Sequence, residues 1–110
     1  MQLKTQTLIK DQCLIDGAWT GTSVDDVINP ATGAVVGRVP HPGAAETRTA
    51  IEAANRACPA RSGQLAGERA KVLRRWYELQ QEHAEDLAHL MTAEQGKPLA
   101  EARGEVAYGA

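Results

Sequence analysis

The strongest candidate nucleophiles in this 110-residue chain are two cysteines, Cys13 and Cys58. A catalytic thiolate needs a lowered pKa, which a helix N-terminus or a cationic neighbour supplies, and it needs access to its substrate. Cys13 lies in a strand-like run, and Cys58 lies near the end of a predicted helix, where the helix dipole disfavours a thiolate. We therefore predict that both thiols are inert. The chain has no C-x-x-C motif and no nearby histidine pair that would make them zinc ligands.

Gly96 followed by Lys97 suggests a phosphate-binding loop, in which backbone amides cradle the phosphates and the lysine reaches them. That pattern requires a glycine five residues before Gly96 and a serine or threonine after the lysine. Met91 and Pro98 occupy these two positions, and the chain contains no G-x-G-x-x-G fingerprint for a dinucleotide. The sequence therefore predicts neither a catalytic residue nor a cofactor-binding residue in this chain.

The histidines do not form a metal site. His83 and His89 are six residues apart, which places them on different faces of a helix, whereas zinc ligands on a helix lie three or four residues apart. We predict that both are exposed and that His41 lies in a loop. Four basic residues of the second predicted helix are balanced by acidic residues downstream, as on a solvated helix face. The basic residues are Arg69, Lys71, Arg74 and Arg75, and the acidic ones are Glu78, Glu82, Glu85 and Asp86.

Charge and hydropathy exclude two classes of partner. The formal net charge of −2 argues against a non-specific nucleic-acid binder, which carries a basic excess. No apolar run reaches the roughly 18 residues of a membrane span, and two cysteines form no disulfide framework. We therefore expect no nucleic acid, no membrane and a cytoplasmic location.

The elements that would position these residues divide the chain into a strand and hairpin region over 1–42 and helices over 43–110. Asp16 and Gly17 stand between apolar residues and predict a two-residue hairpin turn with positive φ at both positions. Extended runs follow at 24–28 and 34–39. An NPATG turn at 29–33 separates them, with proline to fix φ and glycine to supply a left-handed residue.

Apolar residues at spacings of three and four predict four helices from Gly43 onward. Pro59 closes the first, and Ser62 and Gly63 form the break after it. The second covers 67–81, the third covers 82–95 with Gly96 as its left-handed C-terminal residue, and the fourth begins at Leu99. The fourth runs to the last residue without a cap, so we expect the chain to be truncated at its C-terminus. The predicted buried faces are Ala50, Ile51, Ala54 and Ala57 in the first helix, Ala70, Leu73, Trp76 and Tyr77 in the second, Leu87, Leu90 and Met91 in the third, and Leu99, Ala102 and Val106 in the fourth.

Six short blocks resemble, in order and spacing, the N-terminal blocks of the aldehyde dehydrogenase superfamily. They are IDGAW at 15–19, NPATG at 29–33, VP at 39–40, AIEAA at 50–54, ERAKVLR at 68–74 and LMTAEQGKPLAEA at 90–102. The last block is most similar to the NAD(P)-dependent succinate-semialdehyde dehydrogenases. The resemblance implies an α+β fragment, with short strands followed by about four helices, that is an incomplete part of a Rossmann-like aldehyde dehydrogenase domain.

The resemblance also implies a chemistry. Family members bind NAD or NADP, attack the aldehyde with a cysteine thiolate, and use a glutamate to activate water. In the family, these groups lie beyond residue 110. The resemblance implies that the parent enzyme oxidises an aldehyde to a carboxylate and forms a homo-oligomer. This chain alone is expected to be inactive, to bind no cofactor, and to pack against the rest of the domain. Carbonyl oxygens of Val27 and Ile28 and the carboxylate of Glu94 match a monovalent cation site of some relatives, and such oxygens suit a hard cation.

Two positions depart from the family pattern. Arg61 stands where an aromatic residue usually follows a Pro-Ala pair, and Leu65 stands near the place where serine or threonine commonly caps the second helix. The lost aromatic would lower stability by roughly 1.5–3 kcal/mol and the lost cap by about 1 kcal/mol. The alternative to a partial aldehyde dehydrogenase is a free-standing helical interaction module without enzymatic activity. Such a module would show a protected core in amide exchange.

Overall fold

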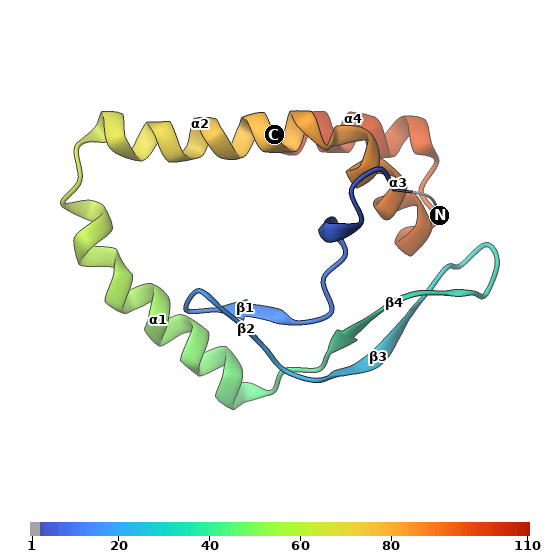
Figure 1. Ribbon diagram of the computed structural model, residues 1–110, viewed down its shortest axis with the longest axis horizontal. Helices are drawn as coiled ribbons and strands as arrows, with labels where there is room; N and C mark the ends of the chain where they lie inside the picture. Colours follow the sequence, from blue (N-terminus) through green and yellow to red (C-terminus); the bar gives the residue numbers. More distant parts are fainter. Residues whose placement is uncertain (1–2) are drawn as a thin grey trace.

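The computed structural model describes residues 3–110, and within this range short strands precede helices (Figure 1). The predicted α+β organisation is confirmed. No helix in this described part is both long and apolar enough to cross a membrane. The elements are the 3-10 turn η1 (Gln6–Leu8), the strands β1 (Cys13–Ile15), β2 (Ala18–Thr20), β3 (Ser23–Ile28) and β4 (Val35–Pro40), and the helices α1 (Ala44–Ser62), α2 (Ala66–Glu82), α3 (Ala84–Gln95) and α4 (Leu99–Gly109).

The strands form two separate antiparallel hairpins, β1 with β2 and β3 with β4. In the first, Asp16 and Gly17 have φ values of 52° and 77°, which confirms the predicted two-residue turn. In the second, the NPATG turn closes on Asn29. Its carbonyl oxygen accepts from the Gly33 amide at 2.8 Å, and its side-chain Oδ1 accepts from the Ala31 amide at 2.9 Å. Both predicted turns therefore follow from their local sequence.

Helix α1 does not end at Pro59, so that predicted end is wrong, whereas the predicted break at Ser62 and Gly63 is confirmed. The helix continues to Ser62. A proline nitrogen cannot donate the bond to the preceding turn, but the turn after the proline is still able to form. The Gly63 amide donates to the Pro59 carbonyl at 3.1 Å, which shows that this last turn is intact. Arg61 in the same turn adds a positive charge at the negative end of the helix dipole.

The buried face of α1 also differs from the prediction. Its buried residue is Ala53, at 8% exposure, whereas Ile51 is 63% exposed. Of the predicted face only Ala50 is half-buried, while Ala54 and Ala57 are exposed. The reason is the position of the β1–β2 hairpin, which packs against α1 through β1. Arg56 follows Ala53 by three residues and donates to Oδ2 of Asp16, in the hairpin turn, at 2.9 Å.

The core lies between α3 and α4. Ala88 and Ala102 have no exposed surface, and Val106 completes this cluster, with half-buried Leu87, Met91 and Leu99 packed around it. The predicted stripe of α4 is thus confirmed. The predicted residues of α3 (Leu87, Leu90 and Met91) are only half-buried, and the buried residues of that helix are Asp86, Ala88 and Ala93. The small alanine side chains allow the two helix backbones to approach closely.

Gly96 joins α3 to α4 in the left-handed conformation that the sequence predicts. Its φ is 80°, and its amide donates to the Thr92 carbonyl at 2.9 Å. A Cβ at this position would lie 2.9 Å from Cγ of Pro30, so a side chain would clash with the NPATG turn. The glycine therefore serves two purposes, because it ends α3 and lets the β3–β4 turn lie against the α3–α4 connection.

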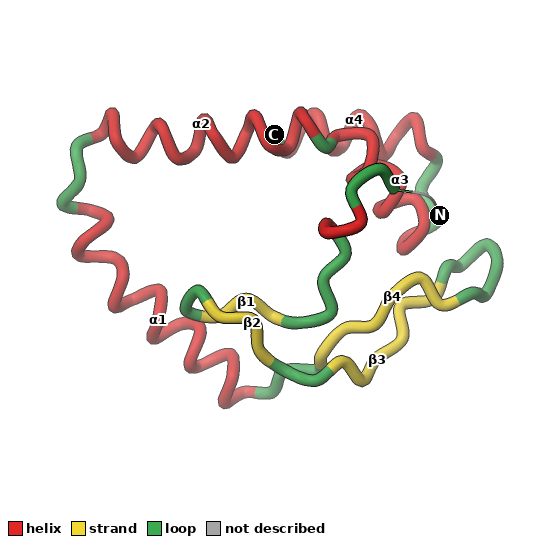
Figure 2. Tube along the Cα trace, in the orientation of Figure 1, coloured by secondary structure: helices red, strands yellow, loops and turns green. Residues whose placement is uncertain are grey.

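Helix α2 stands apart from this core. None of its residues is buried, and Leu73 and Trp76 are 59% and 62% exposed. Figures 1 and 2 show α2 along one side of an open frame, with α1 and the strands forming the other sides. The radius of gyration is 16.5 Å, against about 13 Å for a compact domain of 100 residues. The predicted burial of Ala70, Leu73, Trp76 and Tyr77 is therefore wrong for residues 3–110, because nothing in this described part covers them.

Candidate functional site

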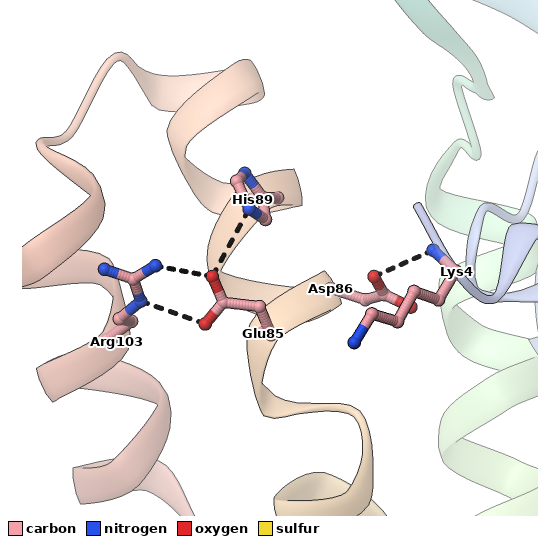
Figure 3. Close-up of polar contacts among 5 residues, drawn as sticks. All are labelled: Lys4, Glu85, Asp86, His89 and Arg103. Carbon is pink, nitrogen blue, oxygen red and sulfur yellow. Dashed lines mark hydrogen bonds and ion pairs between the residues drawn. The ribbon is translucent and has the colours of Figure 1, made fainter. Parts of the chain in front are cut away.

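A cluster of polar side chains starts at the first turn of α3. Figure 3 shows that Glu85 and Asp86 project from neighbouring positions toward different partners. The carboxylate of Asp86 accepts from the backbone amides of Lys4 at 3.0 Å and of Thr5 at 2.8 Å. These hydrogen bonds, with the Lys4 amide contributing most, hold the pKa of Asp86 below its usual value even though burial opposes this. The residue is 6% exposed and ties the N-terminal segment to α3.

Glu85 faces the other way, toward α4. Its two carboxylate oxygens accept from Arg103 Nε at 2.9 Å and Nη2 at 2.5 Å, which is a bidentate pair. The same carboxylate lies 3.3 Å from Nε2 of His89. The Arg103 hydrogen bonds lower the pKa of Glu85, and the carboxylate in turn raises the pKa of Arg103. This cluster joins two helices at the surface and contains no nucleophile.

The two histidines that were predicted to be exposed, His83 at the N-cap of α3 and His89 within α3, are not fully exposed. His83 and His89 are both half-buried, because His83 lies 3.5 Å from the Thr5 hydroxyl and His89 beside Glu85. His41 lies in the loop after β4 as predicted, and its Nδ1 is 2.7 Å from Oδ2 of Asp25. The sequence could not show the contact of His83, because its partner is 78 residues away in the chain.

The two cysteines lie in different elements and are both free thiols. Cys58 is exposed in α1, while Cys13 is half-buried in β1 and lines a cavity of about 190 Å³ together with His41 and Glu46. His41 is 77% exposed at its side chain. Its imidazole is therefore solvated and paired with Asp25. Within residues 3–110, no three His, Cys, Asp or Glu side chains are grouped so that they could hold a metal ion.

Gly96 and Lys97 do not form a phosphate loop. The Gly96 amide, which a phosphate would need, already donates to the Thr92 carbonyl. The Lys97 ammonium forms an ion pair with Glu105 of α4. Both groups therefore serve the connection between α3 and α4.

The three residues predicted to bind a cation are only partly brought together. Val27 and Glu94 line the same cavity of about 200 Å³, which lies where β3, β4, α3 and the N-terminal segment meet. Ile28 does not line it. Arg38 does, and its Nε donates to Oδ1 of Asp26 at 2.7 Å. Lys10 lines it as well, so the cavity has one carboxylate and two cationic side chains among its lining residues.

The departure from the family at Leu65 has a visible consequence. Leu65 is the N-cap residue of α2, and no side chain accepts from the free amides of the first turn. Its side chain is 78% exposed. Arg61, at the other departure, donates to Oε1 of Gln64 at 3.1 Å and lies at the surface. The two positions flank the α1–α2 connection, so both differences fall in the least buried part of the molecule.

Comparison with known proteins agrees with the order of elements and motifs. The sequence profile of the aldehyde dehydrogenase family matches residues 19–110. The chain belongs to the aldehyde dehydrogenase family.

Individual relatives show which members of the family this chain is similar to. A glutarate-semialdehyde dehydrogenase of Pseudomonas aeruginosa is 56% identical over 113 aligned residues, which cover 100% of this chain and 23% of the relative. The NADP-dependent succinate-semialdehyde dehydrogenase GabD of Escherichia coli is 54% identical, with 100% of this chain and 23% of the relative covered.

Among solved structures, an E. coli NADP-dependent enzyme superposes with a TM-score of 0.92 at 52% identity, over 97% of this chain and 23% of that one. A succinate-semialdehyde dehydrogenase from Burkholderia pseudomallei gives the same TM-score at 46% identity, over 98% and 23%. The chain thus spans about a quarter of the length of the relatives that it matches. The resemblance to the semialdehyde branch is confirmed, and the comparisons give no support to a free-standing interaction module.

Proposed function

We propose that this chain is the N-terminal structural segment of an NAD(P)-dependent dehydrogenase that oxidises succinate or glutarate semialdehyde to the dicarboxylate. The observation that carries the proposal is the identity of 54–56% over the whole chain with two curated semialdehyde dehydrogenases. In such an enzyme the nucleophilic cysteine, the general base and the coenzyme contacts come from the remaining three quarters. The segment, with a strand region at 1–42 and a helical region at 43–110, would supply structure and no reacting group.

The surface of the chain supports a scaffolding role. Its accessible area is 7998 Å², about 2,100 Å² more than the roughly 5,900 Å² expected for a compact protein of this mass. An excess of that size matches a large obligate interface. Exposed large apolar residues, Trp76 and Leu73 of α2 among them, contribute to it. We infer that the rest of the dehydrogenase domain covers them.

A chimera tests the proposal. This chain replaces the matching 23% of the E. coli succinate-semialdehyde dehydrogenase, and NADPH formation is followed with succinic semialdehyde and with glutaric semialdehyde. The chimera is expected to keep activity within about tenfold of the parent, since one decade corresponds to about 1.4 kcal/mol. The 110-residue chain, purified alone, is expected to form no NADPH or NADH. A folded chimera without activity, or coenzyme reduction by the isolated chain, would overturn the proposal.

A monovalent cation site at Val27, Ile28 and Glu94 remains a proposal. It is supported by the shared cavity of Val27 and Glu94 and by the preference of hard cations for carboxylate and carbonyl oxygens. Ile28 is its least supported member. In the chimera, replacing choline chloride by sodium or potassium chloride should raise the melting midpoint, and Glu94→Gln should abolish the difference. The matched control Glu101→Gln lies on α4 and should preserve it. An equal response of both variants would exclude the site.

We further propose that the full-length enzyme is a homo-oligomer in the cytoplasm. Two free cysteines, Cys13 and Cys58, suit a reducing compartment. Sedimentation equilibrium of the chimera would report the oligomeric state, and cell fractionation of the tagged native protein would report the location. A monomer, or recovery outside the cytoplasm, would contradict the respective statement.

A further inference from the structure

The cavity that Val27 and Glu94 share is lined by two cationic side chains, Lys10 and Arg38, as well as by the Glu94 carboxylate. Arg38 has a partner of its own, since its Nε donates to Oδ1 of Asp26 at 2.7 Å. Among residues 3–110, neither Glu94 nor Lys10 belongs to an ion pair. Glu94 and Lys10 thus carry opposite charges on one cavity without being paired to each other.

The Lys10 ammonium is held by a different group, the indole ring of Trp19 in β2. Its Nζ lies over that ring, 5.1 Å from the centroid. Trp19 is 47% exposed, and the register of the first hairpin places it opposite Leu14. The face of an aromatic ring attracts a cation, and tryptophan does so more strongly than the other aromatic residues. Trp19 therefore offers the ammonium a position that is not on the carboxylate.

The two positions open to this ammonium are close in free energy. Lys10 and Glu94 are both exposed residues, and an exposed cation–π contact and an exposed ion pair contribute to a similar small extent. The flexible four-carbon stem of a lysine carries a compact charge with freely rotating donors. Such a side chain exchanges between a ring and a carboxylate that both lie within its reach. On the carboxylate, its ammonium supplies the same unit charge as a monovalent cation.

We propose that Lys10 is an internal competitor of the monovalent cation for Glu94, and that the Trp19 ring lowers this competition by holding the ammonium away from the carboxylate. The inference deepens the cation site of the proposed function and rests on it. It makes Lys10 and Trp19 the residues that set how much cation the cavity needs. Neither of them contributes an oxygen ligand.

Cation titrations of the chimera with the E. coli relative test the competition. Sodium chloride replaces choline chloride at constant ionic strength, the melting midpoint is followed, and the half-saturating sodium concentration is compared between variants. Lys10→Gln should lower that concentration by about twofold to fivefold, the range that loss of an exposed ion pair allows. Lys71→Gln is the matched control, because it removes the same charge from α2, and it should leave the concentration unchanged.

Trp19→Leu distinguishes competition from simple repulsion by a nearby charge. It keeps the net charge but removes the ring from Lys10, so it should raise the half-saturating sodium concentration by about twofold to threefold. In a Lys10→Gln background the same substitution should have no effect, because no ammonium is left to release. Trp19→Phe keeps a weaker ring and should give a smaller rise, and it carries the test if Trp19→Leu does not fold.

The outcomes separate this inference from the proposals beneath it. A rise on substitution of Trp19 that requires Lys10 confirms the competition. No rise, or an equal rise with and without Lys10, overturns the inference and leaves the cation site intact, provided that Glu94→Gln still abolishes the sodium response. A chimera with native residues that shows no sodium response overturns the cation site and the inference with it. NADPH formation by the same chimera reports separately on the proposed dehydrogenase function.

Discussion

Helix α4 and helix α2 differ in a way that their compositions do not indicate. Helix α4 has few large apolar residues but buries Ala102 and Val106 against Ala88 of α3. Helix α2 has more and larger apolar residues, and all of them are exposed. The difference shows that apolar content does not determine burial, which requires a second surface at the right distance. For α4 that surface lies within residues 3–110, and for α2 it does not.

The largest expected effect comes from filling the α3–α4 contact. Ala88→Leu inserts three carbons where no surface is exposed, and should lower the free energy of unfolding by about 3 kcal/mol through overpacking. Trp76→Ala removes a larger side chain that is 62% exposed, and should change it by less than about 0.5 kcal/mol in this chain. Urea titration followed by circular dichroism measures both. A larger loss for Trp76→Ala would reverse the comparison.

The next effect concerns the N-terminal segment that Asp86 holds on α3. Asp86→Asn should strip the exchange protection of one of the Lys4 and Thr5 amides and weaken that of the other, because one acceptor oxygen becomes a donor and the remaining one is uncharged. The folded-state pKa of Asp86 is lowered, so its contribution is complete above the unfolded-state pKa of about 3.9 and is lost as pH falls through the folded value. Amide exchange between pH 7 and pH 3 measures this in the native chain.

Two outcomes distinguish protonation of Asp86 from a general effect of low pH on the chain. The asparagine variant should show no further loss of Lys4 and Thr5 protection on acidification. Glu85→Gln on the same turn should leave both amides protected, since its carboxylate contacts Arg103 and His89 instead. If acid removes the protection equally in the wild type and in Asp86→Asn, another group holds the segment.

Restoring the hydrogen bond that Pro59 omits should stabilise α1. Pro59→Ala supplies an amide to the preceding turn in an exposed helix, and should raise stability by about 1–2 kcal/mol, less than the interior penalty of about 3 kcal/mol because the site lies in the last turns. Helicity at 222 nm and the melting midpoint measure it. Pro59→Gly restores the amide but adds backbone freedom, so it should gain less. No gain from alanine would mean that α1 is not the limiting element.

The smallest expected effect concerns the N-terminus of α2. Leu65→Ser places an acceptor at the N-cap, where the first-turn amides have no side-chain partner, and should add about 1 kcal/mol. Leu65→Ala removes the exposed leucine without adding a cap, and should change stability little. Thermal melts of the three proteins decide between them. Equal behaviour of serine and alanine would show that the α2 N-terminus frays regardless of its cap.

Local chemistry made most elements of this protein predictable. The positive φ values of Asp16, Gly17 and Gly96 follow from residue type, and so do the turns that they form. The Pro59 boundary was wrong because proline removes one donor without preventing the turn that follows it. The face of α1 was wrong because the β1–β2 hairpin, distant in the sequence, selects Ala53 rather than Ile51.

The candidate site was harder to predict than the elements. Asp86 looks in the sequence like an ordinary acidic residue of a first helical turn, and its partners are more than 80 residues away. Val27 and Glu94 were placed together only by resemblance, and the structure puts them on one cavity while leaving Ile28 outside it. Periodicity describes one element at a time, so it carries no information on which distant backbone amides a carboxylate meets.

Residue order alone was enough to indicate the turns, the four helices and the family, because each of these depends on neighbouring side chains or on a motif read along the chain. Only the tertiary structure determined that Ala53 and Asp86 are buried and that Ala88 packs with Ala102. It also determined that the apolar residues of α2 are exposed. The physical reason is that burial depends on contact between separate elements. An apolar face is buried only when another surface reaches it.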